Sequence, residues 1–257
     1  MNKIEEFLSQ CIVLDTETTS SDYKEAEIIE SGFVVRKNGA WEMYQDLHKP
    51  LKGPIPPKIE SICYITNEMV ENSTPFVDCA ANFQKVVNQY TSGYVVAHNY
   101  SYDQRVLINN GITLPENSIC TWRIAKKLFL ESTEITETNL PYLRFALDLD
   151  IPLEYRCHRA GHDSLITGHL LEALVQLMLS YGILDETIDL GPQVMAYSNS
   201  PIIITTMPFG KHKGQPLTSV PPSYWSWAMN NTDWFNSESD NYDPDLAASI
   251  YAALESQ

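Results

Sequence analysis

The chain has 257 residues, enough for one large domain or for one domain with a small appendage. Hydrophobic residues make up 44% of the sequence and charged residues 19%, a balance that allows a sizeable core and excludes global disorder. The net charge of −16 argues against nucleic-acid binding, which depends on Lys and Arg, unless bound metal ions or a local basic patch offset it.

Cysteine usage and hydropathy bear on the compartment. Five cysteines are scattered along the chain without a Cys-x-x-Cys pair, and the acidic N-terminal segment lacks a long apolar run. This pattern predicts free thiols in a reducing compartment and therefore a cytoplasmic protein. The most apolar predicted helix, around residues 170–179, is interrupted by Glu172 and Gln176, so we expect no membrane-spanning segment.

The first predicted strand, residues 11–14, is uniformly apolar and runs directly into Asp15, Thr16 and Glu17. A short apolar run without alternation indicates a strand covered on both faces. Because strand side chains alternate, Asp15 and Glu17 point to the same side, about 7 Å apart. Two such carboxylates repel each other unless a cation lies between them, and hard oxygen ligands suit Mg²⁺ or Mn²⁺. The alternative is a strand end that frays into an acidic turn.

The following elements alternate between strands and helices. A hairpin is expected from strands at 28–36 and 41–47, joined at Asn38-Gly39. Buried strands are predicted at 93–97 and 119–120, and helices at the ranges 65–70, 76–90, 100–108, 122–130, 140–147 and 159–181. This alternation indicates a three-layer α/β domain with a mixed sheet.

The composition changes after residue 181, where we expect the first domain, residues 1–181, to end. Residues 182–200 carry Gly, Asp, Asn and Ser and are predicted to be a linker. Residues 201–235 are predicted to form a small basic and aromatic module. Residues 236–257 are predicted to be an acidic tail with one amphipathic helix at 244–254, suited to docking a protein partner.

Two further carboxylates lie on predicted helices. Asp163 lies at the centre of an apolar stripe, since the apolar residues at 166, 170, 174 and 177 fall within about 60° of it on a helical wheel. Asp103 is flanked by Val106 and Leu107 on the helix face that must pack on the sheet. A buried carboxylate is costly unless it is paired or bound to a metal. The alternative is a bond to a neighbouring Arg or to backbone amides at the helix start.

Two histidines are candidates for a general base beside Asp163. In a continuous helix His158 would lie about 140° from Asp163, so we expect His158 on the loop that precedes the helix. The wheel places His162 on the polar flank, which favours a solvated histidine.

In this order, the segments DTETT, HNYSYD and HRAGHD resemble the three motifs of the DEDD superfamily of 3′–5′ exonucleases, histidine subgroup. The resemblance spans about residues 8–180 and implies the ribonuclease-H-like exonuclease fold, with a mixed five-stranded sheet flanked by helices. It implies that Asp15, Glu17, Asp103 and Asp163 are catalytic metal ligands and that His158, by its spacing, is the catalytic base. It also implies two Mg²⁺ ions, for which Mn²⁺ can substitute, that activate a water and stabilise the leaving 3′ oxygen.

The substrate contacts are also expected partly from resemblance. Residues 207–228, MPFGKHKGQPLTSVPPSYWSWA, are similar to the segment that follows the exonuclease domain in exodeoxyribonuclease X-like proteins. Lys211 and Lys213, next to aromatic residues, suit phosphate contacts and base stacking; the alternative is a self-contained module with core tryptophans and solvated lysines. Family analogy adds Thr18 and Thr19 as contacts to the terminal nucleotide. Arg159, beside His158, is expected to contact phosphate.

The sequence therefore predicts a metal-dependent 3′–5′ exonuclease that releases 5′-mononucleotides, with DNA as the preferred substrate and DNA repair as its setting. The alternative is an exoribonuclease acting on RNA ends or short oligonucleotides, because nothing in the motifs reads the 2′-hydroxyl. A catalytically silent nucleic-acid-binding protein is a third reading, although all four carboxylates and the histidine are present.

Overall fold

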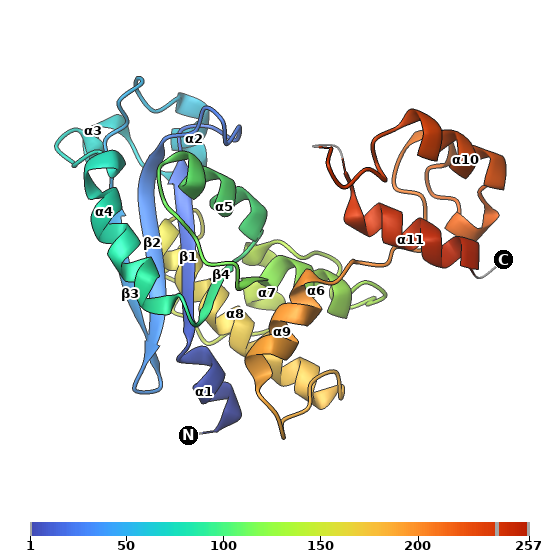
Figure 1. Ribbon diagram of the computed structural model, residues 1–257. Coiled ribbons are helices and arrows are strands. Elements are labelled where there is room, and N and C mark those ends of the chain that lie inside the picture. Colours follow the sequence, from blue (N-terminus) through green and yellow to red (C-terminus); the bar gives the residue numbers. More distant parts are fainter. Residues whose placement is uncertain (1, 240–241, 256–257) are drawn as a thin grey trace. The chain divides into compact units, whose positions relative to one another are not determined.

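The computed structural model describes residues 2–239 and 242–255, which form two compact units, Met1–Asn199 and Ser200–Gln257 (Figure 1). Within the described ranges, no helix combines the length and the apolar character that crossing a bilayer requires.

The first unit is built on a five-stranded sheet in the order β3-β2-β1-β4-β5. The central strand β1 pairs antiparallel with β2 and parallel with β4; β3 extends one side antiparallel and β5 the other parallel. The predicted mixed five-stranded sheet is thereby confirmed. The strand bounds are β1 Cys11–Thr18, β2 Ile28–Lys37, β3 Ala40–Leu47, β4 Tyr94–Ala97 and β5 Ser118–Cys120.

The predicted hairpin is formed by β2 and β3 around a two-residue turn. Asn38 and Gly39 both have positive φ, 51° and 79°, as the tightest turn between twisted strands requires. Asn tolerates this conformation and Gly adopts it without steric cost, so the local sequence specifies the turn.

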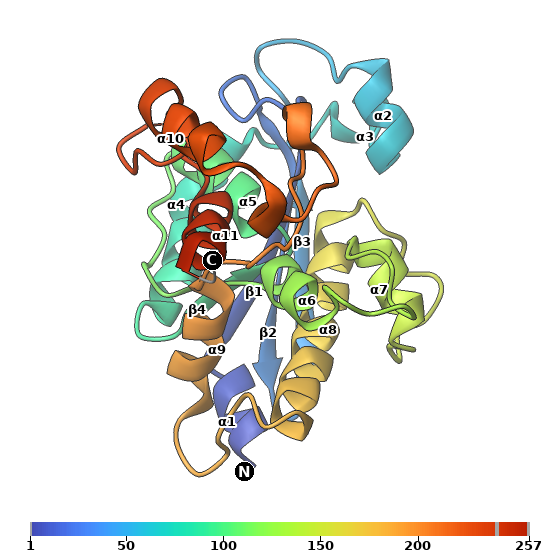
Figure 2. The ribbon, with the colours of Figure 1, turned by 90° about the vertical axis from the view of Figure 1, so that its right-hand side faces the viewer.

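Helices cover both faces of the sheet (Figures 1 and 2). Cys11 and Val13 of β1 pack with one helical layer, whereas Ile12 and Leu14 pack with the other, as strand alternation dictates. The first layer contains α1 Lys3–Leu8, α6 Thr121–Leu128, α7 Leu140–Ala146, α8 Ala160–Ser180 and α9 Leu190–Asn199. The second contains α4 Phe76–Val87, continued by the 3₁₀ turn Asn88–Tyr90, and α5 Tyr100–Asn109. A smaller cluster holds α2 Pro57–Cys63 and α3 Asn67–Val70 against β2.

The predicted linker at 182–200 is wrong over its second half, because α9 belongs to the core of the first unit. Leu190 and Val194 are buried in the cluster that also holds α8. Ser198 Oγ accepts a hydrogen bond from the backbone N of Cys120 at 2.8 Å, which ties α9 to the edge strand β5. Gly182, Asp185 and Asp189 lie in the turn before this helix, whereas Gly191 and Ser198 lie within it, so composition alone did not separate turn from helix.

The second unit combines the predicted module and the predicted tail. It contains short 3₁₀ turns at Gly210–His212 and Leu217–Ser219, and the helices α10 Pro222–Asn231 and α11 Pro244–Glu255. The helix predicted at 244–254 is confirmed as α11, but residues 236–257 are not simply a tail. Leu246 and Ile250 of α11 are buried together with Trp225 of α10, so the module core includes α11. Residues 240, 241, 256 and 257 of the predicted tail lie outside the described residues.

Candidate active site

The end of β1 positions three of the predicted site residues. Because alternation puts Cys11 and Val13 on the α8 side, Asp15 and Glu17 continue along that side. Thr16 faces the opposite layer, where its backbone N and its Oγ1 donate to Asp103 Oδ1 at 3.0 and 2.8 Å. Asp103, buried on α5, is thereby held at the end of β1.

The first turn of α8 lies very close to the sheet at Gly32. A Cβ at this residue would lie 2.2 Å from the backbone of Ala160, so only glycine allows the approach. Gly32 pairs with Asp15 across the β1–β2 ladder. Asp163, in the same first turn of α8, is therefore held close to the carboxylates of β1.

Glu17, His158 and Asp163 form a cluster with metal-ligating geometry. Each offers one ligand atom, and the three atoms lie within 4.8 Å of one another. His158 is exposed on the loop before α8, as predicted, with a left-handed φ of 63°, and its backbone N donates to Asp163 Oδ2 at 2.8 Å. Asp163 Oδ1 is buried and accepts no hydrogen bond from the described residues, as expected of an oxygen intended for a cation.

The electrostatics of the cluster also indicate a cation site. Burial, together with repulsion from nearby carboxylates, raises the pKa of Asp103 and of Asp163 to about 7 and that of Glu17 to about 8. Burial, followed by repulsion from Asp103 and Asp163, raises the pKa of Asp15 well above its usual range. Four carboxylates with these shifts fit divalent metal ions, which would relieve both the desolvation and the repulsion.

The cluster opens into a cavity of about 430 Å³ that is lined by polar and apolar residues together. Its lining includes Asp15, His158 and Asp163 and the apolar side chains of Trp122, Leu140 and Pro141. The volume and the mixture of apolar surface with a few convergent polar groups are typical of ligand sites.

Sequence reasoning missed His98, which also lines this cavity. It follows β4 directly, and its Nε2 donates to Thr138 O while its Nδ1 bonds Thr121 Oγ1, both at 3.0 Å. Burial lowers the pKa of His98 to about 4, so the ring is neutral near pH 7. The sequence feature that could have identified His98 is its position at the carboxyl end of a buried parallel strand, where ligand sites of α/β proteins commonly lie.

His162 is not part of the cluster. Its Nδ1 accepts a hydrogen bond from the backbone N of Arg156 at 3.1 Å, and its ring packs edge-on against Tyr155 with centroids 5.0 Å apart. It is half-buried rather than solvated, so it packs on the loop that carries His158 instead of facing the carboxylates.

Arg159 is committed to a partner that the sequence did not indicate. Its Nε donates to both carboxylate oxygens of Glu30 at 3.1 Å and its Nη2 to Oε1 at 2.6 Å. Glu30 is fully buried and also accepts from the backbone N of Ala160 at 2.8 Å. The guanidinium anchors the start of α8 to β2 and is still 23% exposed, so contact between Arg159 and phosphate stays a prediction.

The two threonines that end the first motif lie at the end of β1, where Thr18 is the last strand residue and Thr19 follows it. Thr18 Oγ1 bonds Ser20 O at 2.8 Å and the hydroxyl of Tyr102 at 2.6 Å. Thr19 Oγ1 accepts from the backbone N of Glu27 at 3.0 Å. Lys211 and Lys213, the other predicted substrate contacts, belong to the second unit.

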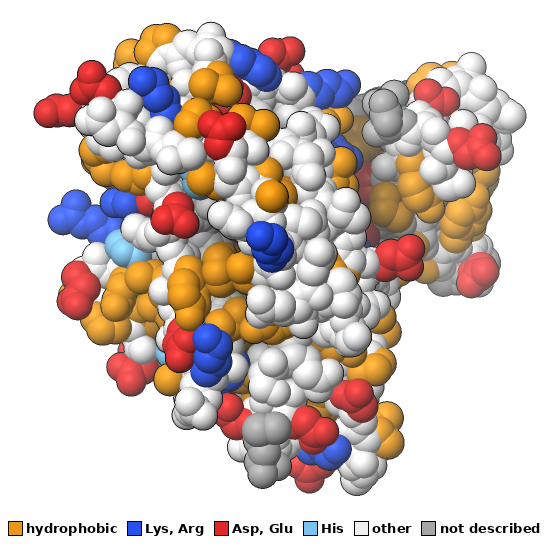
Figure 3. All heavy atoms as spheres, turned by 60° about the vertical axis from the view of Figure 1, so that its left-hand side comes forward, with side chains coloured by type: hydrophobic (Ala, Val, Ile, Leu, Met, Phe, Trp, Pro, Cys, Tyr) orange, Lys and Arg blue, Asp and Glu red, His pale blue; other side chains and the backbone are white. Residues whose placement is uncertain are grey.

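Several other basic side chains are also committed to internal contacts. Lys126 lies over the Trp122 ring and Arg105 over the Tyr23 ring, at 4.9 and 5.0 Å from the ring centroids. Arg123 Nε donates to Ser198 O at 3.1 Å. On the face shown in Figure 3, Lys and Arg form separate groups among Asp and Glu rather than one continuous track. That face therefore offers no continuous basic surface to counter the net charge of −16 and attract a nucleic-acid strand.

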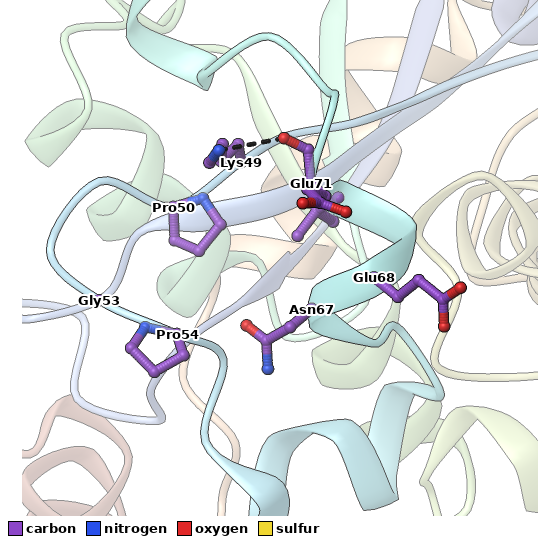
Figure 4. A pocket seen from close by; sticks show the side chains of 8 residues that line it. Lys49, Pro50, Gly53, Pro54, Asn67, Glu68 and Glu71 are labelled. Carbon is purple, nitrogen blue, oxygen red and sulfur yellow. Dashed lines mark hydrogen bonds between the residues drawn. The ribbon is translucent and has the colours of Figure 1, made fainter.

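A second cavity, also of about 430 Å³, lies between the loop at 49–54 and α3 (Figure 4). Lys49 Nζ donates to Glu71 O at 3.0 Å, and Asn67 Nδ2 donates to Ile55 O at 3.1 Å, so polar groups on its walls bond within the protein. None of the clustered carboxylates lines it.

Comparison with known proteins gives two family matches, one in each unit. Residues 12–171 match a family model described as Exonuclease (RNase_T). Residues 199–238 match a model described as a putative quorum-sensing-regulated virulence factor.

Individual relatives are similar over the first unit. Exodeoxyribonuclease 10 of Escherichia coli (strain K12) is 31% identical over 189 residues, which cover 72% of this chain and 76% of that protein. The 3′-5′ exonuclease DinG of Bacillus subtilis (strain 168) is 31% identical over 181 residues, 65% of this chain and 18% of that protein. A solved structure of Exonuclease X in complex with 5′ overhanging duplex DNA has the same fold, with a TM-score of 0.55, 24% identity, and coverage of 74% of this chain and 99% of that one.

Proposed function

The chain belongs to the exonuclease family, and from this premise we propose that it is a metal-dependent 3′–5′ exonuclease that releases 5′-mononucleotides from DNA. The observation that carries the proposal is the meeting of Glu17, His158 and Asp163 within 4.8 Å, beside a cavity that Asp15 also lines. The preference for DNA draws on the similarity to exodeoxyribonuclease 10, of which the matched region covers 76%.

Asp15, Glu17, Asp103 and Asp163 would hold the metal ions in this proposal. Two Mg²⁺ ions, or Mn²⁺ in their place, suit four carboxylates whose charged forms are destabilised by burial and mutual repulsion. When bound, such ions lower the pKa of a water and stabilise charge on the leaving oxygen. The uncoordinated lone pairs of Asp163 Oδ1 support this ligand role.

His158 is proposed to accept the proton from the attacking water. Its imidazole is exposed beside the carboxylates, and its backbone N–H bond to Asp163 Oδ2 holds the loop against α8. A neutral imidazole nitrogen can take a proton during the attack and release it to solvent afterwards.

The apolar side chains that line the cavity are proposed to hold the terminal nucleoside. Trp122, Leu140 and Pro141 can pack against a base or sugar and exclude water from the reacting phosphate. Thr18 and Thr19 remain proposed contacts to the terminal nucleotide, since they directly follow Glu17 at the end of β1.

The cellular setting is part of the proposal. Free cysteines at all five positions support a reducing, cytoplasmic location, compatible with DNA repair. Because α11 buries only part of its surface, the acidic side chains near it also support docking of a protein partner.

The test compares release of mononucleotides from DNA and RNA strands of identical sequence, with a label at either end, in Mg²⁺ and in EDTA. We expect stepwise shortening from the 3′ end, faster on DNA and absent in EDTA. Faster cleavage of RNA would instead identify an exoribonuclease. Binding of either strand without cleavage in Mg²⁺ or Mn²⁺ would identify a silent binding protein.

The metal-free protein is expected to lose stability as the pH rises. Asp103 and Asp163 have folded-state pKa values of about 7 and Glu17 of about 8, against roughly 4 for unfolded carboxyl groups. Between these values the folded state binds more protons than the unfolded state, so unfolding becomes easier with increasing pH. Thermal unfolding in EDTA should give a lower midpoint at pH 8 than at pH 5.

Divalent ions should reverse this trend. Because Mg²⁺ or Mn²⁺ binds the ionised carboxylates, we expect the metal-induced rise in the midpoint to be larger at pH 8 than at pH 5. A control with a monovalent salt at equal ionic strength removes general screening. An equal rise at both pH values would show that the clustered carboxylates do not bind the metal.

Removing Arg159 is expected to destabilise the first unit. The Arg159→Met variant leaves the fully buried Glu30 without its guanidinium partner. Breaking a buried pair costs about 3–5 kcal/mol, and we expect about 3 because the Arg159 side chain is 23% exposed. Urea unfolding measures this change.

The matched control is the double variant Glu30→Gln with Arg159→Met. The glutamine side chain introduced at position 30 is neutral and can still accept from Ala160 N, so most of the lost stability should return. If Arg159→Met kept full stability and only raised KM for a strand, the result would support the predicted contact with phosphate and contradict the structural role.

A further inference from the structure

The second unit separates its charges along the sequence in a way that hydrolysis does not require. Residues 200–232 contain two lysines, Lys211 and Lys213, and no Asp or Glu. Residues 233–257 contain six acidic residues and no Lys or Arg. In a chain with a net charge of −16, a stretch of 33 residues without an acidic side chain is a local exception that favours an anionic ligand.

The two lysines lie on a turn whose backbone is closed by hydrogen bonds. Met207 N donates to Gln215 O at 2.9 Å, and Gly214 N donates back to Met207 O at 2.8 Å. Both lysines are exposed, and neither forms an ion pair with any residue in the described ranges. The turn therefore presents two uncompensated ammonium groups from an ordered loop.

Aromatic side chains of α10 lie against this turn. The Tyr224 ring contacts the His212 ring at a centroid distance of 4.7 Å and the Trp227 ring at 5.6 Å with an interplanar angle of 37°. His212 is buried, and its Nδ1 bonds Gln215 Oε1 at 2.8 Å, so it supports the turn from within.

The tryptophans of α10 divide into a core residue and a surface residue. Trp225 is 1% exposed and belongs to the module core, whereas Trp227 is 51% exposed. The Trp227 indole makes a tilted contact with the Tyr224 ring and is half-exposed, so part of its flat surface is accessible for stacking. Packing within the module accounts for Trp225 and does not account for the exposure of Trp227.

We propose that Lys211, Lys213, Tyr224 and Trp227 form a binding site for single-stranded nucleic acid. The lysines would contact backbone phosphates, and Trp227 would stack on an unpaired base. In a duplex the base faces are already stacked on their neighbours, so an exposed indole selects a single strand. An acidic peptide would complement the lysines but offers no regular series of flat rings.

Strand binding at this proposed site is separate from hydrolysis and requires no metal ion. The module and the exonuclease unit share one chain, so a strand held by the module would have a raised local concentration around the exonuclease unit. The proposal therefore adds a strand-binding element to the proposed exonuclease and can be tested while hydrolysis is blocked.

The experiment measures fluorescence anisotropy of labelled oligo(dT) and oligo(rU) with the full chain in EDTA, over a range of salt concentrations. Trp227→Ala should weaken binding between about 5- and 150-fold, as expected for the loss of one stacked base. Lys211→Glu with Lys213→Glu should weaken binding and lower the slope of log affinity against log salt by about 0.7 for each lysine. Comparison of the two oligonucleotides identifies whether DNA or RNA is preferred.

Matched controls separate these effects from general charge and aromatic effects. Lys3→Glu with Lys85→Glu makes the same change in net charge on the first unit, and Tyr251→Ala removes an aromatic ring that is 50% exposed on α11. Both controls should bind like the wild-type protein, and all variants should keep the wild-type melting midpoint. A folded Trp227→Ala and a folded lysine variant that bind like the wild type would overturn the proposal, as would a wild-type protein that binds a protein partner but neither oligonucleotide.

Failure of this proposal is distinguishable from failure of the proposed function. Hydrolysis of the p-nitrophenyl ester of thymidine 5′-monophosphate by the wild-type protein requires only one nucleotide and reports the exonuclease unit. If the wild type hydrolyses the ester and the module variants bind the strand normally, the proposed module site is refuted and the proposed exonuclease activity stands. If the variants lose strand binding and the wild type does not hydrolyse the ester, the module site is supported and the proposed exonuclease activity is refuted.

Discussion

The Asp163→Asn variant is expected to lose hydrolysis almost completely. Replacing one carboxylate oxygen by an amide nitrogen removes a proposed metal ligand and a negative charge from the cluster of Glu17, His158 and Asp163. We expect a fall in kcat of about 10³-fold or more, since removal of a single group that stabilises an oxyanion already costs roughly 10²–10³-fold. Release of mononucleotides in saturating Mg²⁺ measures the loss.

The same variant should be more stable than the wild type without metal. Burial and neighbouring carboxylates raise the pKa of Asp163 to about 7, so its ionisation destabilises the folded state near pH 8. The amide that replaces this carboxylate cannot ionise, and the midpoint of thermal unfolding in EDTA at pH 8 should rise. Asp78→Asn, at an exposed position on α4, is the matched control and should change neither quantity.

Asp15→Asn should behave in the same way, because Asp15 lines the same cavity and its pKa is also raised by burial. A variant of either residue that kept near-wild-type activity in Mg²⁺ would exclude that residue as an essential ligand. Lower stability in EDTA would show that the removed carboxylate had a structural partner.

The His158→Ala variant is expected to lose roughly 10²–10⁴-fold in kcat, the usual contribution of a general base. The loss should appear in kcat more than in KM, because the proton moves in the transition state. The backbone N–H of residue 158 still reaches Asp163 Oδ2 in this variant, so the position of the loop should be retained. Steady-state kinetics on a labelled DNA strand provide the measurement.

The His162→Ala variant provides the matched control. Its ring packs against Tyr155 and bonds the backbone of Arg156, on the loop that carries His158 but outside the carboxylate cluster. A small decrease in activity, with a modest loss of stability, is expected. A larger kinetic loss at residue 162 than at residue 158 would show that His162, rather than His158, is the base.

Local sequence was enough to predict the central strand, the hairpin and the spacing of the acidic residues. Alternation along β1 put Asp15 and Glu17 on one side of the strand, and the wheel of the long helix put Asp163 among apolar residues. The same spacing placed His158 outside that helix, where the structure has it. These predictions depend on local backbone geometry, which a short stretch of sequence largely specifies.

Contacts between distant parts of the chain determine which of the predicted site residues lie together and which bond to other residues. Glu30 lies 129 residues before Arg159, and no local pattern connects the buried carboxylate with the guanidinium that pairs with it. The sequence alone does not show why residue 32 must be glycine. The structure gives the reason, because a Cβ at this position would lie 2.2 Å from the backbone of Ala160.

Packing also sets the limits of the two units and the roles of their aromatic residues. Residues 190–199 have a turn-like composition, but α9 is stabilised by burial against α8 and β5, contacts that are distant in sequence. Trp225 and Trp227 are two residues apart on one helix, so they face different surroundings, one the core and one the solvent. The composition of the segment does not distinguish the two tryptophans. Packing against α11 and the rest of the module core determines that Trp225 is the buried one.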